Sequence, residues 1–267
     1  MAKQESVKQM KGRIFLVVVL VVVAWIVGRQ LGIGSHGEGR FELNQNYQLA
    51  PGARVEVSGI NGPVEITTSD TDTAEVHILT TARDEDALED HQITVQQSGS
   101  NLTIHGENHN GWRFWRWLKG SENVRQSVTL KLPHQVELSA KGINGRVTVG
   151  ELDGAVHVAG VNGKVEIERA TGAADVSGVN GAVSLGLARL GDEGLRVSGV
   201  NGRVELRFAD DVNADLVVHG LNGNVANDLP NSTLTQEGHS TWRAHIGTGG
   251  TIISVNGING SIHLTRG

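Results

Sequence analysis

The chain has 267 residues, of which 36 are glycine, and only 4% of them are aromatic. Glycine is about twice as frequent as usual, and so few large aromatic side chains disfavour a conventional α/β enzyme core and favour thin, layered β-structure. With no cysteine, disulfides and a thiolate nucleophile are excluded, and the excess of 29 acidic over 23 basic residues disfavours nucleic acid as a partner.

The N-terminus has the order of an export signal. Residues 1–13 form a basic tail and residues 14–27 carry no charge. A helix of this length spans about 21 Å, less than the ~30 Å hydrocarbon core, so a spanning helix must extend over residues 14–33. We expect a cytoplasmic tail (1–13), a transmembrane anchor or signal peptide (14–33), a linker (34–40) and a β-repeat domain (41–267) outside the cytoplasm. The alternative is secretion after signal cleavage.

One motif, x-G-[IVL]-N-G-x-[VI]-x-[IVL], occurs seven times in this domain and is degraded only at Asn227 in the sixth copy. From Asn144 to Asn222 the motif asparagines are 18, 18, 21 and 21 residues apart, and a looser half-unit lies between consecutive copies. The last step, 37 residues to Asn259, is interpreted as two units with one motif lost. The motif asparagines, predicted to hold turns and form a ladder, are Asn61, Asn144, Asn162, Asn180, Asn201, Asn222 and Asn259.

Asn-Gly tolerates the left-handed backbone of tight turns, and the residues after it alternate between two faces. A β-solenoid would use each Asn-Gly as a corner and stack the copies, whereas a hairpin meander would use it as a two-residue turn. The near-constant period favours stacking, in which like side chains meet. We predict an all-β fold, a β-solenoid-like stack of short strands with Gly-Asn corners after an N-terminal membrane helix, with an antiparallel hairpin meander as the alternative.

Outward positions fit such a stack, because neighbouring coils would lie ~4.8 Å apart and like charges there would repel. Four residues after each asparagine, glutamate alternates with neutral side chains, which describes a solvated sheet face. These positions are Glu65, Thr148, Glu166, Ser184, Glu205, Ala226 and His263.

The most unusual stretch combines aromatic and cationic side chains. We expect it either to cap one end of the stack or to form an exposed patch that contacts a partner, a glycan or a membrane. Its residues are Trp112, Arg113, Phe114, Trp115, Arg116 and Trp117.

From about Phe41 to Leu264, the G-[IV]-N-G-x-V-x-[IVL] copies after an anchor resemble the bacterial "putative adhesin" family of β-strand-repeat cell-envelope proteins of unknown function. The resemblance implies a β-solenoid-like fold and a cell-envelope location. It supplies no catalytic residues.

No catalytic, metal or cofactor site is expected. His105 and His109 lack further converging ligands, and adjacent Asp210 and Asp211 would point to opposite faces of a strand. We therefore expect no enzyme but an exported, membrane-anchored interaction, adhesin-like or scaffold module. Its expected partners are the membrane, through the N-terminal helix, and an envelope protein or glycan. The alternatives are a carbohydrate-active enzyme on a β-helix and an envelope signalling subunit.

The last motif, Asn256 to Leu264, is expected to form an open end of the stack. A terminal coil without a polar cap exposes unpaired backbone groups, which pair readily with another chain. Self-association through this end is therefore expected; the alternative is that the terminal coil is twisted or already covered by the segment around Trp242.

Overall fold

In the computed structural model, the chain is described for residues 20–21, 39–82, 88, 91–106, 124–191 and 194–267. The elements in this part of the chain are strands, so the all-β prediction is confirmed there. No helix among these residues is long and apolar enough to cross a membrane. The predicted membrane segment, residues 14–33, lies outside the described residues except for Leu20–Val21.

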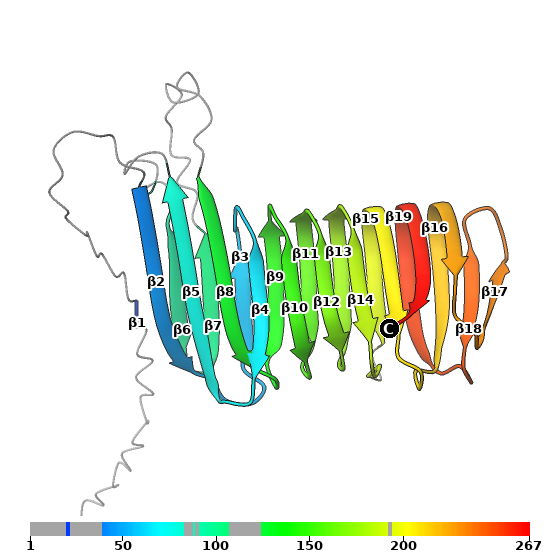
Figure 1. Ribbon diagram of the computed structural model, residues 1–267, viewed down its shortest axis with the longest axis horizontal. Coiled ribbons are helices and arrows are strands. Elements are labelled where there is room, and N and C mark those ends of the chain that lie inside the picture. The colour runs from blue at the N-terminus through cyan, green and yellow to red at the C-terminus, as the bar shows by residue number, and fades with distance from the viewer. Residues whose placement is uncertain (1–19, 22–38, 83–87, 89–90, 107–123, 192–193) are drawn as a thin grey trace, which may run out of the picture.

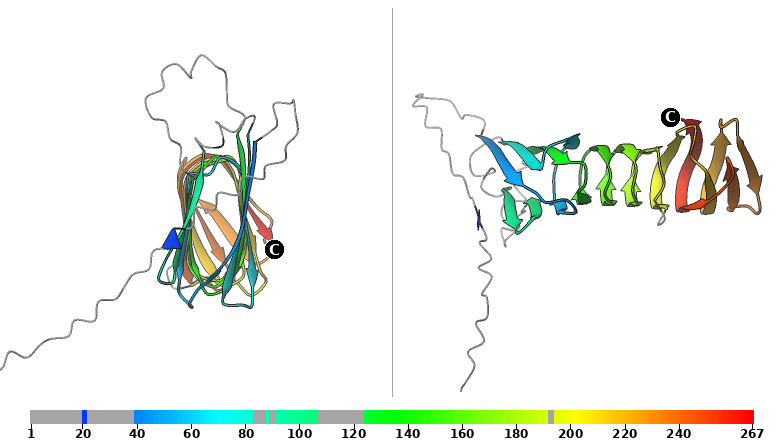
Figure 2. Two further views of the ribbon diagram at one scale, coloured as in Figure 1. Left: turned by 90° about the vertical axis from the view of Figure 1, so that its left-hand side faces the viewer. Right: turned by 90° about the horizontal axis from the view of Figure 1, so that it is seen from below.

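Nineteen strands over the described residues join in one mixed sheet, which curls into an elongated, nearly closed, flattened barrel (Figures 1 and 2). The strands are β1 (Leu20–Val21), β2 (Gly39–Gln48), β3 (Arg54–Ser58), β4 (Val64–Ser69), β5 (Thr73–Ala82), β6 (Ile93–Ser98), β7 (Asn101–Gly106), β8 (Arg125–Pro133), β9 (Glu137–Ile143), β10 (Val147–Leu152), β11 (Val156–Asn162), β12 (Val165–Ala170), β13 (Ala174–Asn180), β14 (Val183–Leu187), β15 (Leu195–Phe208), β16 (Ala214–Asn227), β17 (Ser232–Gln236), β18 (Trp242–Ile246) and β19 (Thr251–Arg266).

The first five motif copies pair with each other in chain order, in parallel and in register, apart from one register shift between Ile167 and Ala170. Strands before the Asn-Gly corner form a first ladder, in the order β3, β9, β11, β13 and β15. Strands after the corner form a second ladder, in the order β4, β10, β12, β14 and β15. Among the described pairings, β9 and β10, which flank the corner at Asn144, pair with neighbouring copies. A hairpin meander would instead pair these two with each other in antiparallel.

The last two copies lie out of chain order. β15, β16 and β19 contain 14, 14 and 16 residues, and each continues through the corner into both ladders. β19 lies between β15 and β16 and has 13 registered pairs with each of them (Figure 1). The 37-residue step from Asn222 to Asn259 is therefore not two units with a lost motif. It contains β17 and β18, which add two antiparallel strands to the first ladder beyond β16. The chain then returns to form β19 between β15 and β16.

The predicted open end is wrong for the same reason. Asn256 to Leu264 belongs to β19 in the interior of the stack, where Ile258 and Ile262 are 1% and 0% exposed. The end is instead formed by β16 with β17 and β18, and the partly buried Leu234 and Trp242 pack against the core there. Step lengths were misleading because every copy carries the same corner, so the motif does not tell which copies are neighbours.

The long step from Asn61 to Asn144 contains an insertion at the opposite end. The second ladder is extended by β5, which pairs antiparallel with β8, and by β2, which pairs antiparallel with β5. The first ladder is extended by β6, which pairs antiparallel with β7. Because β7 and β8 pair with the outer sides of β3 and β4, the copies at Asn61 and Asn144 still stack directly.

The core lies between the two ladders and follows from strand alternation. In β12, Val165 and Ile167 are fully buried while Glu166 between them is partly exposed. Two sheets that pack about 10 Å apart leave room for one thin layer of side chains, which suits Val, Ile and Leu. Among the described residues, Phe208 is the largest fully buried side chain, which agrees with the low aromatic content of the sequence.

Candidate functional site

The motif asparagines form one continuous ladder along the edge that is uppermost in Figure 1. In each pair, the side-chain Nδ2 of one residue donates to the Oδ1 of its neighbour, and all donors point toward the Asn61 end. The distances are 2.9 Å from Asn144 to Asn61, 3.1 Å from Asn162 to Asn144, 3.3 Å from Asn180 to Asn162, 3.5 Å from Asn201 to Asn180, 3.2 Å from Asn259 to Asn201 and 3.0 Å from Asn222 to Asn259.

This asparagine ladder is a surface feature, since all seven residues are exposed. The aligned hydrogen bonds between its side-chain amides polarise one another, but water competes for each of them. The ladder ends at Asn61, whose Nδ2 donates to the carbonyl oxygen of Val124 at 3.4 Å and whose backbone N–H donates to the Gln126 side chain at 2.8 Å. The ladder therefore fixes register more than it adds stability.

The glycine after each asparagine is required by close approach of the backbone, a role that sequence reasoning missed. A Cβ on Gly181 would lie 2.2 Å from the carbonyl oxygen of Gly163, and a Cβ on Gly202 would lie 2.1 Å from that of Gly181. The glycine two residues before the asparagine has a different role. A Cβ on Gly178 would meet its neighbours only at ordinary contact distance, but the backbone of this residue is left-handed, with φ +61°. Glycine is therefore required here by its backbone conformation. The signal for both roles was the presence of both glycines in every copy.

The outer face of the second ladder carries the predicted glutamate column. In spatial order, each glutamate is separated from the next by a neutral or weakly basic side chain. The column is Glu65, Thr148, Glu166, Ser184, Glu205, His263 and Ala226. No two of these glutamates are direct neighbours, so the column is extended without strong repulsion.

A basic column runs beside it, two residues closer to each corner. Lys164 Nζ lies 2.6 Å from Glu166 Oε2, and this hydrogen bond, with smaller contributions from Arg207 and Arg146, lowers the pKa of Glu166 below its usual value of 4.5. Arg146 and Arg203 are exposed, and neither makes an ion pair with any described residue. We refer to Glu65, Arg146, Lys164, Glu166, Arg203 and Glu205 as the charged face.

The charged face contains an open hollow rather than a deep cleft. The hollow spans three neighbouring coils and is lined by Pro63, Val64, Glu65, Arg146, Thr148, Glu166 and Glu168. Its lining combines one unpaired guanidinium with three carboxylates, and its floor is the sheet itself.

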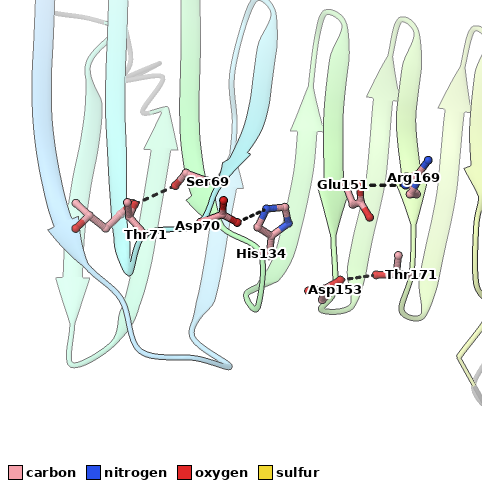
Figure 3. A network of polar contacts seen from close by, with 9 residues as sticks. Ser69, Asp70, Thr71, His134, Glu151, Asp153, Arg169 and Thr171 are labelled. Atoms are coloured by element: carbon pink, nitrogen blue, oxygen red, sulfur yellow. Dashed lines mark hydrogen bonds and ion pairs between the residues drawn. The ribbon is translucent and has the colours of Figure 1, made fainter.

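Polar contacts also link the turns on the edge opposite the asparagine ladder (Figure 3). Thr171 Oγ1 donates to Asp153 Oδ1 at 2.9 Å, and Arg169 Nη1 lies 3.4 Å from Glu151 Oε2 in the neighbouring coil. His134 Nε2 lies 3.5 Å from Asp70 Oδ1. These contacts connect coils that are already paired, so they reinforce the stack.

The described residues contain no group of three or more His, Asp or Glu side chains that could hold a metal ion. His105 Nδ1 lies 2.9 Å from Ser58 Oγ, and His109 lies outside the described residues. Asp210 bonds to Arg266, and Asp215 to His245. Each is an exposed surface pair on the strands or turns and not part of a converging constellation.

The aromatic and cationic stretch from Trp112 to Trp117 lies outside the described residues. Its predicted roles, as a cap or as a partner or membrane contact, stay predictions.

No family model matches the chain, and no curated protein matches it. Among solved structures it is similar to a "putative cell adhesion protein" from Clostridium sporogenes, with 12% identity, 86% of this chain and 100% of that chain covered, and a TM-score of 0.49. It is also similar to a "putative adhesin" from Bacteroides fragilis (12% identity, 84% and 97% covered, TM-score 0.31). A "putative lipid binding protein" from Parabacteroides distasonis has 12% identity, 84% and 97% coverage and a TM-score of 0.25.

These neighbours include bacterial proteins with the adhesin label that the repeat motif suggested, and they cover most of the chain. Similarity at this level of identity and TM-score transfers no ligand, partner or residue role to this chain.

Proposed function

We propose that this chain is an exported, membrane-anchored β-solenoid that serves as an adhesin-like interaction or scaffold module of the cell envelope. In this proposal it is not an enzyme, and the charged face is its contact surface. The parallel, in-register pairing of consecutive copies supports the solenoid. The basic residues before the uncharged stretch 14–27 support export and anchoring.

The observation that carries the proposal is the exposure of charge on an open surface that extends over several coils. Four of the first five motif copies contribute side chains to the charged face, and the ladders beneath hold these copies in register at a strand spacing of ~4.8 Å. Arg146 and Arg203 have no ion-pair partner among the described residues, so their donors are available to a ligand. An extended glycan or an envelope protein can contact several coils of such a surface at once, whereas a small substrate needs a concave site.

The pKa of Glu166 does not suit this residue to the role of general acid in the glycosidase alternative. A general acid in a glycosidase needs a raised pKa so that it carries a proton at neutral pH. Lys164 instead lowers the pKa of Glu166, which keeps this carboxyl ionised.

The proposal is tested by measuring binding of the purified full chain to immobilised cell-envelope glycan and, separately, to detergent-extracted envelope protein. The double variant Arg146→Ala/Arg203→Ala should lose at least tenfold in affinity for one of them. Arg196→Ala is the matched control, because Arg196 is also exposed but lies on the first ladder. Binding of the wild-type chain should weaken at high salt, since exposed charges are screened. Equal binding by all three proteins would contradict the assignment of this face.

A further inference from the structure

The gap between β15 and β16, which β19 occupies, is a strand-binding site in its own right. We call it the strand slot. β19 is paired on both sides, with Asn201 and Asn222 opposite Asn259. The slot therefore binds a complete strand through its backbone on two sides and through the corner motif.

The slot is not imposed by chain length. A step of 21 residues joins Asn180 to Asn201, which are direct neighbours in the ladder. A step of 21 residues also joins Asn201 to Asn222, which are separated by one strand. A step of this length therefore leaves no space between the copies at Asn180 and Asn201 but leaves space for one strand between those at Asn201 and Asn222. The slot exists because a strand fills it.

The filling strand is apolar on its inner side. The side chains that β19 places in the core are 0% or 1% exposed, namely Ile253, Val255, Ile258, Ile262 and Leu264. An empty slot would expose this part of the core and two rows of unpaired backbone groups, so it strongly favours an occupant.

The connection between β18 and β19 is a glycine hinge, Gly247-Thr248-Gly249-Gly250. Gly247 and Gly249 have φ +61° and +73°. The closed turn is held by four backbone donors. Thr248 N–H donates to Asn213 Oδ1 at 2.8 Å and Gly250 N–H to Asp215 Oδ2 at 3.1 Å, while Gly247 N–H donates to the carbonyl oxygen of Asn231 at 2.9 Å and Gly249 N–H to that of Ile246 at 3.1 Å. Three glycines in four residues also allow an extended conformation. In that conformation β19 would leave its own stack.

We propose that the strand slot accepts β19 from a second copy of this chain, so that the protein forms strand-exchanged dimers. The exchanged strand makes the same contacts as the resident one, and only the hinge changes. A second copy is the occupant that matches the slot in register, inner side chains and corner motif at once. The resident strand has the higher effective concentration, so exchange increases with protein concentration during folding.

Two single-cysteine variants of this cysteine-free chain test the proposal. Ser198 of β15 lies directly opposite Asn256 of β19, at a strand spacing of ~4.8 Å that a disulfide can bridge. Full-length Ser198→Cys and Asn256→Cys chains are mixed, unfolded, refolded together at high concentration and oxidised. The expected result is a covalent heterodimer, joined by a disulfide between position 198 of one chain and position 256 of the other, whose yield increases with protein concentration.

Two controls make the outcome decisive. Ser254→Cys replaces Asn256→Cys in the offset mixture, because Ser254 lies opposite Arg196 and is out of reach of residue 198. The double variant Ser198→Cys/Asn256→Cys, refolded at low concentration, should close the disulfide within one chain. Heterodimer from the matched mixture and little from the offset mixture supports exchange. No heterodimer from the matched mixture, or equal yields from both, overturns the proposal, as does a double variant that fails to close.

Discussion

Replacement of Gly181 by alanine should destabilise the stack more than replacement of Gly178, the other glycine of the same motif copy. The new Cβ would lie 2.2 Å from the carbonyl oxygen of Gly163 and 2.8 Å from its carbonyl carbon. The coil has backbone equally close on its other side, at Gly202, so it has little room to move. At φ +152° a non-glycine residue also costs about 1–3 kcal/mol, and overpacking adds about 1–3 kcal/mol. We expect a total loss of about 2–6 kcal/mol in the free energy of unfolding.

Gly178→Ala is the matched control from the same motif copy. Its Cβ would meet its nearest neighbour, the backbone nitrogen of Gly160, at 3.5 Å, which is ordinary contact. Its left-handed φ of +61° costs alanine about 1–2 kcal/mol, of which about 0.4–1 kcal/mol is offset by the lower entropy of the unfolded chain. Urea unfolding followed by far-UV circular dichroism measures both variants. If Gly178→Ala lowered the free energy of unfolding as much as Gly181→Ala, close backbone approach would not be the reason for the second glycine.

Three further outcomes follow from the same structure. Asn180→Ala removes two exposed side-chain hydrogen bonds of 3.3 and 3.5 Å and should lower the free energy of unfolding by about 1 kcal/mol. An unchanged urea midpoint would show that the ladder adds no stability. Ile262→Lys introduces a charge at a position that is 0% exposed and should cost about 4 kcal/mol or more; a midpoint near that of the wild type would contradict the interior position of β19. The pKa of Asp215 is held below its usual 3.8 by the Gly250 N–H and then by His245, so its carboxylate stabilises the fold above that pH. The difference in melting temperature between wild type and Asp215→Asn should therefore disappear as the pH falls through the lowered pKa, and a difference that persisted in stronger acid would refute this role.

Local features of the fold could be predicted from the sequence because each motif copy contains both its turn residues and its alternation of apolar and polar side chains. Alternation after Asn162 places Val165 and Ile167 inside and Lys164 and Glu166 outside, as the structure does. Repetition of Asn-Gly at a near-constant period implied that like residues would meet, and the structure joins all seven asparagines in one ladder.

The order of the last copies could not be predicted, because β16 and β19 present the same corner to β15. Their order depends instead on residues 228–246, in which Leu234 and Trp242 pack against the end of the core without any repeated motif. The insertion between Asn61 and Asn144 was hidden for a similar reason, since a long step along the chain does not prevent direct stacking. The glutamate column could be predicted from the repeat, but the pairing of Glu205 with His263 follows only from the insertion of β19 beside β15.

The central claim is the order of strands β15, β19 and β16, because the strand slot and the far end of the glutamate column both depend on it. Residues 198, 256 and 219 occupy equivalent positions in these three strands. Three double-cysteine variants of the full chain, Ser198→Cys/Asn256→Cys, His219→Cys/Asn256→Cys and Ser198→Cys/His219→Cys, are oxidised at high dilution and assayed for a disulfide within one chain. We expect rapid closure of the first two and none of the third, whose positions lie about 9.6 Å apart. Rapid closure between residues 198 and 219 would contradict this order, because β16 would then stack directly on β15.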